Sequence, residues 1–177
     1  MELKKFIRPI PDFPKKGVLF RDITPLLSDG NALHFVADEM ARHYIKKDFS
    51  VDKVVSAESR GFILGAILAS TLHAGFVPLR KPGKLPAKTI KQEFKTEYST
   101  DAFEVHEDAI KKGDNCIIVD DILASGGTSR AAVDLVEKLG GNVKELFFLI
   151  ELDFLGGRKR LSGYGIFSII HYGGEEK

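Results

Sequence analysis

The sequence has one cysteine, almost no net charge and no long apolar run, and each absence excludes a class of protein. Cys116 is the only cysteine among the 177 residues, so no disulfide can form within the chain. It lies in an apolar run, which suits a buried thiol in a reducing cytoplasm. We therefore expect a cytoplasmic protein without a disulfide scaffold and without a cysteine metal site.

Charge and hydropathy argue against nucleic-acid and membrane partners. The 26 basic and 25 acidic residues give a net charge of +1, so neither nucleic acid nor an acidic membrane surface is indicated. No segment approaches the ~18 apolar residues of a membrane span, and residues 1–10 do not resemble a signal peptide. The length suits one domain, so we expect residues 1–177 to form a single domain.

The charges are nevertheless unevenly distributed along the chain. Residues 80–95 carry a net charge of +5, and residues 97–108 carry −5. Near-neutrality is thus a cancellation between neighbouring segments. The basic segment is suited to a small, strongly anionic ligand.

The hydrophobic pattern indicates alternating strands and helices. Helical spacing predicts helices near residues 33–44 and 132–139, and the nearly continuous apolar run at 63–72 is consistent with a helix buried against a sheet. Short apolar runs predict strands at residues 54–57, 76–79, 116–119, 146–152 and 166–170. This alternation is typical of an α/β fold with a central, mainly parallel sheet flanked by helices, in which ligands bind at the carboxyl ends of the strands.

Two segments do not follow this alternation. Residues 1–30 are rich in proline and glycine, which predicts an arm over the core with little regular structure. Residues 81–100 are polar and weakly periodic, which predicts an excursion from the sheet that a hairpin would suit.

The most informative segment is a small-residue loop between a predicted strand and a predicted helix. Gly126 and Gly127 allow the backbone to approach an anion closely. The helix that starts near Thr128 points unpaired N–H groups at the same place, and Ser125, Thr128 and Ser129 add hydroxyl donors. The loop therefore predicts a site for a phosphate monoester. It is not a P-loop, because the lysine of that motif is absent.

Two adjacent acids, Asp120 and Asp121, precede this loop. Their carboxylates could accept hydrogen bonds from two neighbouring hydroxyls, as on a ribose, or lie near Mg²⁺. The alternative, on the residues alone, is a capped helix with two solvated acids. The five histidines lack metal-ligand spacing, so we expect no zinc site.

Several segments together resemble one enzyme family. Residues 119–128 resemble the 5-phosphoribosyl-1-pyrophosphate (PRPP) motif of type I phosphoribosyltransferases. Further matching segments narrow the resemblance to the adenine phosphoribosyltransferases: residues 12–25, 58–62, 79–86 and 97–98. The resemblance implies a type I phosphoribosyltransferase-like fold with a flexible hood. It also implies transfer of the 5-phosphoribosyl group from PRPP to N9 of adenine, giving AMP and pyrophosphate with Mg²⁺ as cofactor.

The resemblance also implies roles for particular residues toward PRPP. The 5-phosphate would be held by Ala124, Ser125, Gly126, Gly127 and Thr128. The ribose would face Asp120 and Asp121, with Mg²⁺ held mainly by PRPP beside them and with no direct protein ligand. Pyrophosphate would be received by Glu58, Ser59, Arg60, Arg80, Lys81 and Lys84. A non-proline cis peptide is expected at Glu58–Ser59.

Adenine and the hood involve other segments. The adenine segment would be Leu19, Phe20 and Arg21, with main-chain groups of Arg21 reading the base and the ring of Phe20 either stacking on it or only packing. Residues 84–100 would form the hood, in which Glu97 handles a proton at the adenine imidazole edge. A homodimer is implied, with Arg80 or Lys81 completing the neighbouring site.

Two other functions remain open from the sequence. A PRPP- or nucleotide-sensing regulator would keep the phosphate loop without turnover. A 6-oxopurine phosphoribosyltransferase would use the same loop with a different base. The adenine segment and Glu97–Tyr98 favour the adenine enzyme over both.

The role of Glu97 can be tested by a conservative substitution. Glu97→Gln should lower kcat much more than it raises the KM for adenine, because the amide cannot accept the proton. Steady-state kinetics with adenine as the varied substrate measures both constants. An unchanged kcat would remove Glu97 from the mechanism.

Overall fold

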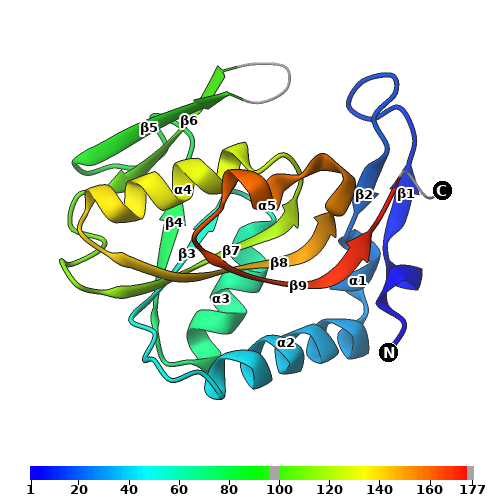
Figure 1. Cartoon of the computed structure of the whole chain (residues 1–177), viewed down its shortest axis with the longest axis horizontal. Helices are drawn as coiled ribbons and strands as arrows, with labels where there is room; N and C mark the ends of the chain where they lie inside the picture. The colour runs from blue at the N-terminus through cyan, green and yellow to red at the C-terminus, as the bar shows by residue number, and fades with distance from the viewer. Residues whose placement is uncertain (96–99, 175–177) are drawn as a thin grey trace.

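A five-stranded parallel sheet forms the centre of the molecule (Figure 1). The computed structural model describes residues 1–95 and 100–174. Across the sheet the strands are β4 (Gly75–Leu79), β3 (Lys53–Ala57), β7 (Asn115–Leu123), β8 (Asn142–Leu152) and β9 (Gly165–Tyr172). The chain winds outward from β3 to β4 on one side and from β7 to β9 on the other. The winding therefore reverses between β3 and β7, which is where open α/β sheets bind ligands.

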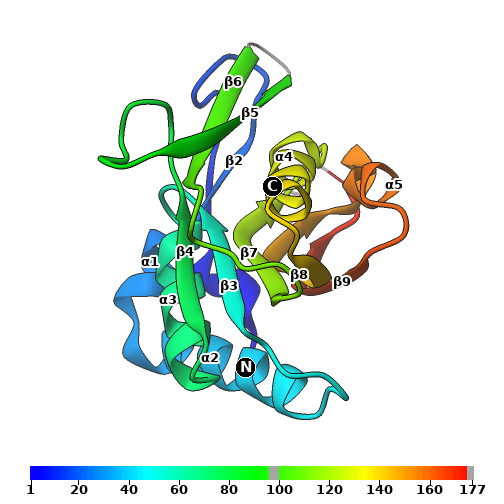
Figure 2. The same cartoon turned by 90° about the vertical axis from the view of Figure 1, so that its left-hand side faces the viewer.

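Helices cover both faces of the sheet, as predicted. They are α2 (Gly30–Ile45) and α3 (Gly61–Thr71) on one face, and α4 (Gly127–Lys138) on the other (Figures 1 and 2). Alternate side chains of β7 enter the two cores, Ile117 beneath α3 and Ile118 beneath α4. Burial on both faces explains the continuous apolar runs in the sequence.

The predicted buried thiol lies in this sheet. Cys116 is fully buried in β7. Removal from water disfavours the thiolate and raises the pKa of Cys116 to about 12. No helix in the described part of the chain is long and apolar enough to cross a membrane.

The N-terminal arm contains only short elements. These are a 3-10 helix, η1 (Leu3–Phe6), two strands, β1 (Arg8–Ile10) and β2 (Phe20–Asp22), and a short helix, α1 (Thr24–Ser28). The two strands pair antiparallel, with Ile10 opposite Phe20. The pair lies beside the carboxyl end of the sheet (Figure 1). The arm thus presents Phe20 at the end of the sheet where ligands are expected.

The predicted excursion is an antiparallel hairpin that lies over α4 (Figure 1). Its strands are β5 (Thr89–Lys95) and β6 (Thr100–His106). Residues 89–95 of the predicted hood are therefore a paired strand. Residues 96–99, which include Glu97, lie outside the described residues.

The hairpin brings the basic and acidic segments together. Lys91 lies opposite Glu104 in the hairpin register, and Lys81 Nζ lies 3.0 Å from Asp101 Oδ2. Part of the positive charge is thus balanced within the chain. The basic segment is less available to a ligand than its +5 charge alone indicates.

Strand β7 is longer than predicted. The sequence predicted a strand that ends at Val119 and a loop that starts at Asp120, whereas β7 continues to Leu123. The long strand β8 supplies backbone partners as far as Leu123, which pairs with Glu151. Asp120 and Asp121 are therefore held in a strand of the sheet. After β8, the short elements η2 (Asp153–Leu155) and α5 (Gly157–Arg160) lead to β9.

Candidate active site

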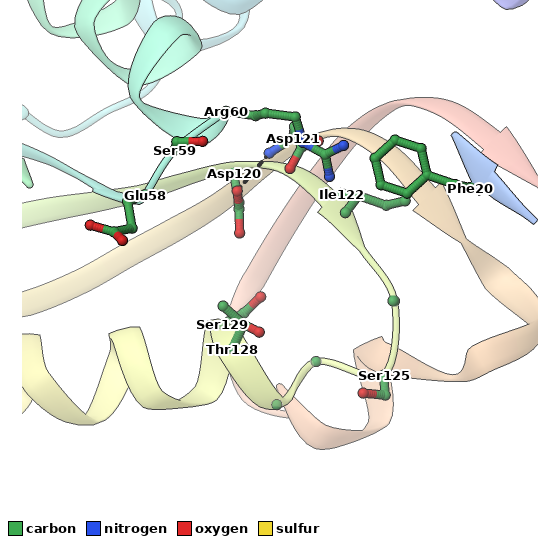
Figure 3. A pocket seen from close by; sticks show the side chains of 13 residues that line it. Phe20, Glu58, Ser59, Arg60, Asp120, Asp121, Ile122, Ser125, Thr128 and Ser129 are labelled. Atoms are coloured by element: carbon green, nitrogen blue, oxygen red, sulfur yellow. Dashed lines mark hydrogen bonds and ion pairs between the residues drawn. The ribbon is translucent and has the colours of Figure 1, made fainter. Parts of the chain in front are cut away.

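A cavity of about 370 Å³ opens where the winding of the sheet reverses. It lies at the carboxyl ends of β3 and β7 and is closed on one side by the arm (Figure 3). Its lining consists of Phe20, Glu58, Ser59, Arg60, Asp120, Asp121, Ile122, Ala124, Ser125, Gly126, Gly127, Thr128 and Ser129. Segments far apart in the sequence therefore meet in one pocket.

One wall of the pocket is the predicted phosphate loop. Gly126 adopts a left-handed conformation with φ +80° and caps α4, which begins at Gly127. Glycine adopts this conformation without the steric cost of a side chain. The loop and the first turn of α4 thus present main-chain N–H groups, and Ser125 and Thr128 add hydroxyls on the same wall (Figure 3).

The opposite wall is formed by the turn after β3. Glu58 and Ser59 are joined by a cis peptide bond, as predicted. Helix α3 starts immediately afterwards, and the N–H of Phe62 donates to Ser59 O at 3.2 Å. The N-terminus of α3 therefore lies on this wall, and helix N-termini favour anions.

Two carboxylates lie between these walls. The side chain of Asp121 is 5% exposed, so Asp121 is not the solvated acid of the alternative prediction. Its Oδ2 lies 2.7 Å from Arg60 Nε, but no described donor makes an aligned hydrogen bond to it. Asp120 Oδ1 accepts a hydrogen bond from the N–H of Asp121 at 2.9 Å.

Burial raises the pKa of both acids. Loss of solvent raises the pKa of Asp120 well above its ordinary value, and the charge of Asp121 adds to this effect. Burial also raises the pKa of Asp121, although the nearby Arg60 opposes the shift. A cation or hydroxyl donors entering the pocket would further favour the charged form of both carboxylates.

The arm contributes one aromatic ring to the pocket. The guanidinium of Arg60 lies 4.7 Å from the centre of the Phe20 ring, so Arg60 contacts both the acid and the ring. On its other side, Phe20 meets Phe13 edge to face, with ring centres 5.1 Å apart. Phe20 therefore both packs within the arm and lines the cavity.

Among the predicted site residues that the structure describes, five do not line this pocket. Arg80 donates to Glu58 and thus touches the wall indirectly, and Lys81 pairs with Asp101. The guanidinium of Arg21 lies 4.0 Å from the centre of the Tyr172 ring, and the Arg21 residue is buried. The other two are the exposed Lys84 and the half-buried Leu19.

One lining residue, Ile122, was missed by the sequence analysis. Ile122 lies two positions after Asp120 and therefore shares its face of β7, which a longer predicted strand would have shown. Ser129, which the sequence indicated as a hydroxyl donor, lines the pocket from the first turn of α4.

Asp120, with Asp121 beside it, suits a divalent cation held mainly by its ligand. Carboxylate oxygens are the donors that Mg²⁺ prefers, and Asp120 lines the pocket, whereas Asp121 Oδ2 already lies 2.7 Å from Arg60 Nε. The described residues contain one group of three potential ligands elsewhere, Glu151, Asp153 and His171. Arg158 already occupies Glu151 there.

The fold is that of a phosphoribosyltransferase. A family model described as the phosphoribosyl transferase domain matches residues 26–155. A loop that caps a helix, two acids at a strand end and a cis turn opposite them are the features that the sequence resemblance implied.

Relatives that match over their full length narrow the class from phosphoribosyltransferases in general to those that are named for adenine. The adenine phosphoribosyltransferase of Halothermothrix orenii is 53% identical over 170 residues, which cover 96% of this chain and 99% of that protein. The Thermotoga maritima enzyme of the same name is 54% identical over 172 residues, covering 97% of this chain and 98% of that protein.

Solved structures agree with these relatives. Adenine phosphoribosyltransferase from Thermoanaerobacter pseudethanolicus matches with a TM-score of 0.92 at 51% identity, over 97% of this chain and 98% of that chain. The Saccharomyces cerevisiae enzyme, in complex with an imino-altritol bisphosphate and adenine, matches with a TM-score of 0.89 at 42% identity, over 94% and 96%. This chain belongs to the adenine phosphoribosyltransferase family.

The raised pKa of Asp120 predicts that this acid costs stability at neutral pH. A folded-state pKa above the unfolded value means that stability falls as pH rises from the ordinary carboxyl range toward that raised pKa. Asp120→Asn removes this cost and keeps the acceptor for the Asp121 N–H. The variant should be more stable than the wild type at pH 8 by roughly 1–2 kcal/mol, and by less at pH 5.

Urea unfolding at both pH values measures this difference. Asp108→Asn, which neutralises an exposed acid, controls for net charge. A variant Asp120→Asn that is no more stable than the wild type at pH 8 would contradict the burial argument.

Proposed function

We propose that this chain transfers the 5-phosphoribosyl group of PRPP to N9 of adenine and releases pyrophosphate and AMP. In this step the bond from ribose C1 to pyrophosphate breaks and the bond from C1 to N9 forms. Adenine loses its N9 proton. The family membership supports the reaction, and the pocket lining offers groups that suit the phosphate, the ribose and the pyrophosphate of PRPP.

The observation that carries the proposal is the spacing of two anion sites around two acids. The wall at α4 suits a phosphate monoester, and the wall at α3 with Arg60 suits a second anionic group. Asp120 and Asp121 lie between the walls and suit the hydroxyls of a ribose (Figure 3). PRPP has this order of groups, with a phosphate at one end, a pyrophosphate at the other and a ribose between them.

The N-terminal arm forms the side of the pocket at which we place the adenine base. Phe20 lines the cavity at its arm side, where its ring can contact a planar purine. We assign base recognition to the segment Leu19, Phe20 and Arg21, with the main chain of Arg21 pairing with adenine. A base with the opposite donor and acceptor pattern would leave buried groups unpaired.

Catalysis then requires stabilisation of charge that develops as pyrophosphate leaves. The positive charge builds on the ribose, by chemical analogy with glycoside cleavage, beside the carboxylates of Asp120 and Asp121. Arg60 and the N-terminus of α3 are placed to bind the leaving group. Mg²⁺ held mainly by PRPP, with Asp120 and Asp121 nearby, would supply further neutralisation of the leaving group.

The remaining assignments complete this proposal. Glu97 handles the proton of the adenine imidazole edge, and residues 84–100 act as a hood that excludes water. Residues 1–177 act as one domain in the cytoplasm, which the free, buried thiol of Cys116 suits.

A substrate comparison tests the function. Purified protein with PRPP and Mg²⁺ should release pyrophosphate and form a nucleotide with adenine. With hypoxanthine or guanine, turnover should be lower by orders of magnitude, because a site built for one hydrogen-bond pattern rejects the other by ~10⁴-fold or more. Faster turnover with a 6-oxopurine, or no turnover with any base, would refute the proposal, and the second outcome would support a regulator.

We also propose a homodimer that forms through α3. This helix is apolar around its axis from residue 61 to residue 69, before the exposed Ser70 and Thr71, and such a pattern is typical of a helix that is covered on every side. Ile63 is nevertheless 41% exposed in the single chain. The guanidinium of Arg80 lies 6.0 Å from the centre of the Phe62 ring of α3. A partner on this face would therefore lie beside Arg80 and Lys81, the residues assigned to the neighbouring site.

A charge placed on this face tests the dimer. Ile63→Glu should convert the protein to a monomer in light scattering coupled to size exclusion, because burial of an unpaired carboxylate is costly. Ile45→Glu is the matched control, since Ile45 is 70% exposed on α2. A dimer that survives Ile63→Glu would place the interface elsewhere.

A further inference from the structure

The phosphate loop is supported from behind by the turn after β8. Gly157, the first residue of α5, lies so close to the loop that a Cβ there would be 2.3 Å from Ala124 O. A Cβ on Gly126 would in turn be 2.8 Å from Gly157 O. The two segments touch backbone to backbone, with no room for a side chain. The position of the turn therefore determines the position of the loop.

Arg158 ties this turn to the end of the sheet. Its Nε and Nη2 donate to the two oxygens of Glu151 at 2.5 and 2.7 Å. Such a bidentate pair fixes geometry as well as charge. Ser168 Oγ also donates to Glu151 Oε2 at 2.7 Å, and Arg158 Nη1 donates to Ile166 O at 3.3 Å. The turn is thus joined to both β8 and β9.

Glu151 is adjacent to the loop within the sheet. It is 3% exposed in β8 and pairs in register with Leu123, the residue that precedes Ala124. A Cβ on Gly157 would also lie 2.8 Å from a methyl group of Leu123. The phosphate loop therefore begins at the end of β7, which pairs with Glu151, and then passes over Gly157, whose neighbour Arg158 binds the same Glu151. Neither charged residue lines the pocket.

We infer that Arg158 is a positioning residue for the phosphate loop. Its pair with Glu151 holds Gly157 against Ala124 and so keeps the N–H groups of residues 126–128 directed at the 5-phosphate. The inference rests on the proposed role of this loop. The opposite wall, at Ser59 and Arg60, receives no support from this turn, so Arg158 acts on one end of the ligand only.

Binding of two partial ligands tests the inference without turnover. Ribose 5-phosphate probes the loop, and pyrophosphate probes the opposite wall, each titrated by calorimetry at the same Mg²⁺ concentration. Arg158→Met should weaken the binding of ribose 5-phosphate by about tenfold or more, because small misplacements of binding groups have large effects. Pyrophosphate affinity should stay within about twofold of the wild type. Arg158→Lys should be intermediate, because lysine keeps the charge and loses the bidentate geometry.

A glycine variant tests the same contact from the other side. Gly157→Ala keeps the ion pair between Arg158 and Glu151, and its methyl group pushes directly on Ala124 O. It should therefore weaken the binding of ribose 5-phosphate and leave the binding of pyrophosphate unchanged. Gly173→Ala is the matched control, because a Cβ there meets open space. If Arg158→Met does not fold, as judged by circular dichroism and thermal unfolding, Gly157→Ala decides the question.

Two results would overturn the inference. One is a folded Arg158→Met or Gly157→Ala protein with wild-type affinity for ribose 5-phosphate. The other is an equal loss of affinity for both ligands, which a general loss of structure produces. If the wild type binds ribose 5-phosphate but uses no base with PRPP, the proposed function fails and the positioning role of Arg158 stands.

Discussion

Two close backbone approaches, one on each side of the end of β7, determine the geometry of this site. Gly61 allows the start of α3 to lie against β7, because a Cβ there would be 3.2 Å from Val119 O and 2.8 Å from the carboxylate oxygen Oδ1 of Asp120. Gly157 allows the turn before α5 to lie against the phosphate loop, because a Cβ there would be 2.3 Å from Ala124 O. Each pocket wall therefore packs closely against the backbone at or after the end of β7. The two helix N-termini and the acids between them depend on these contacts.

Much of the fold could be predicted from the sequence, because its elements follow strong local patterns. Burial on both faces makes the strands apolar throughout, and the helices have clear spacing and glycine boundaries. The segment from Asp120 to Thr128 could also be predicted as a phosphate site from the sequence, since glycines before a helix suit phosphate. The pocket confirms that these residues lie together with Glu58, Ser59 and Arg60.

Other features depend on contacts between distant segments and had no local signal. The extension of β7 through Asp121 depends on partners in β8, and the Arg60–Asp121 pair depends on how β3 and β7 lie side by side. The net charge of residues 80–95 indicated a basic segment available to a small anionic ligand. Pairing with β6 balances part of that positive charge. The bond between Arg158 and Glu151 likewise appears only once β8 and α5 are placed.

The central claim is that the pocket binds a phosphoribosyl group with its phosphate on the α4 side. A crystal structure of the protein with AMP tests this most directly. The account predicts the phosphate within hydrogen-bond distance of N–H groups at residues 126–128, the ribose hydroxyls at Asp120 and Asp121, and the purine toward Phe20. A phosphate bound at Arg60 and Ser59 instead, with the purine away from the arm, would contradict it.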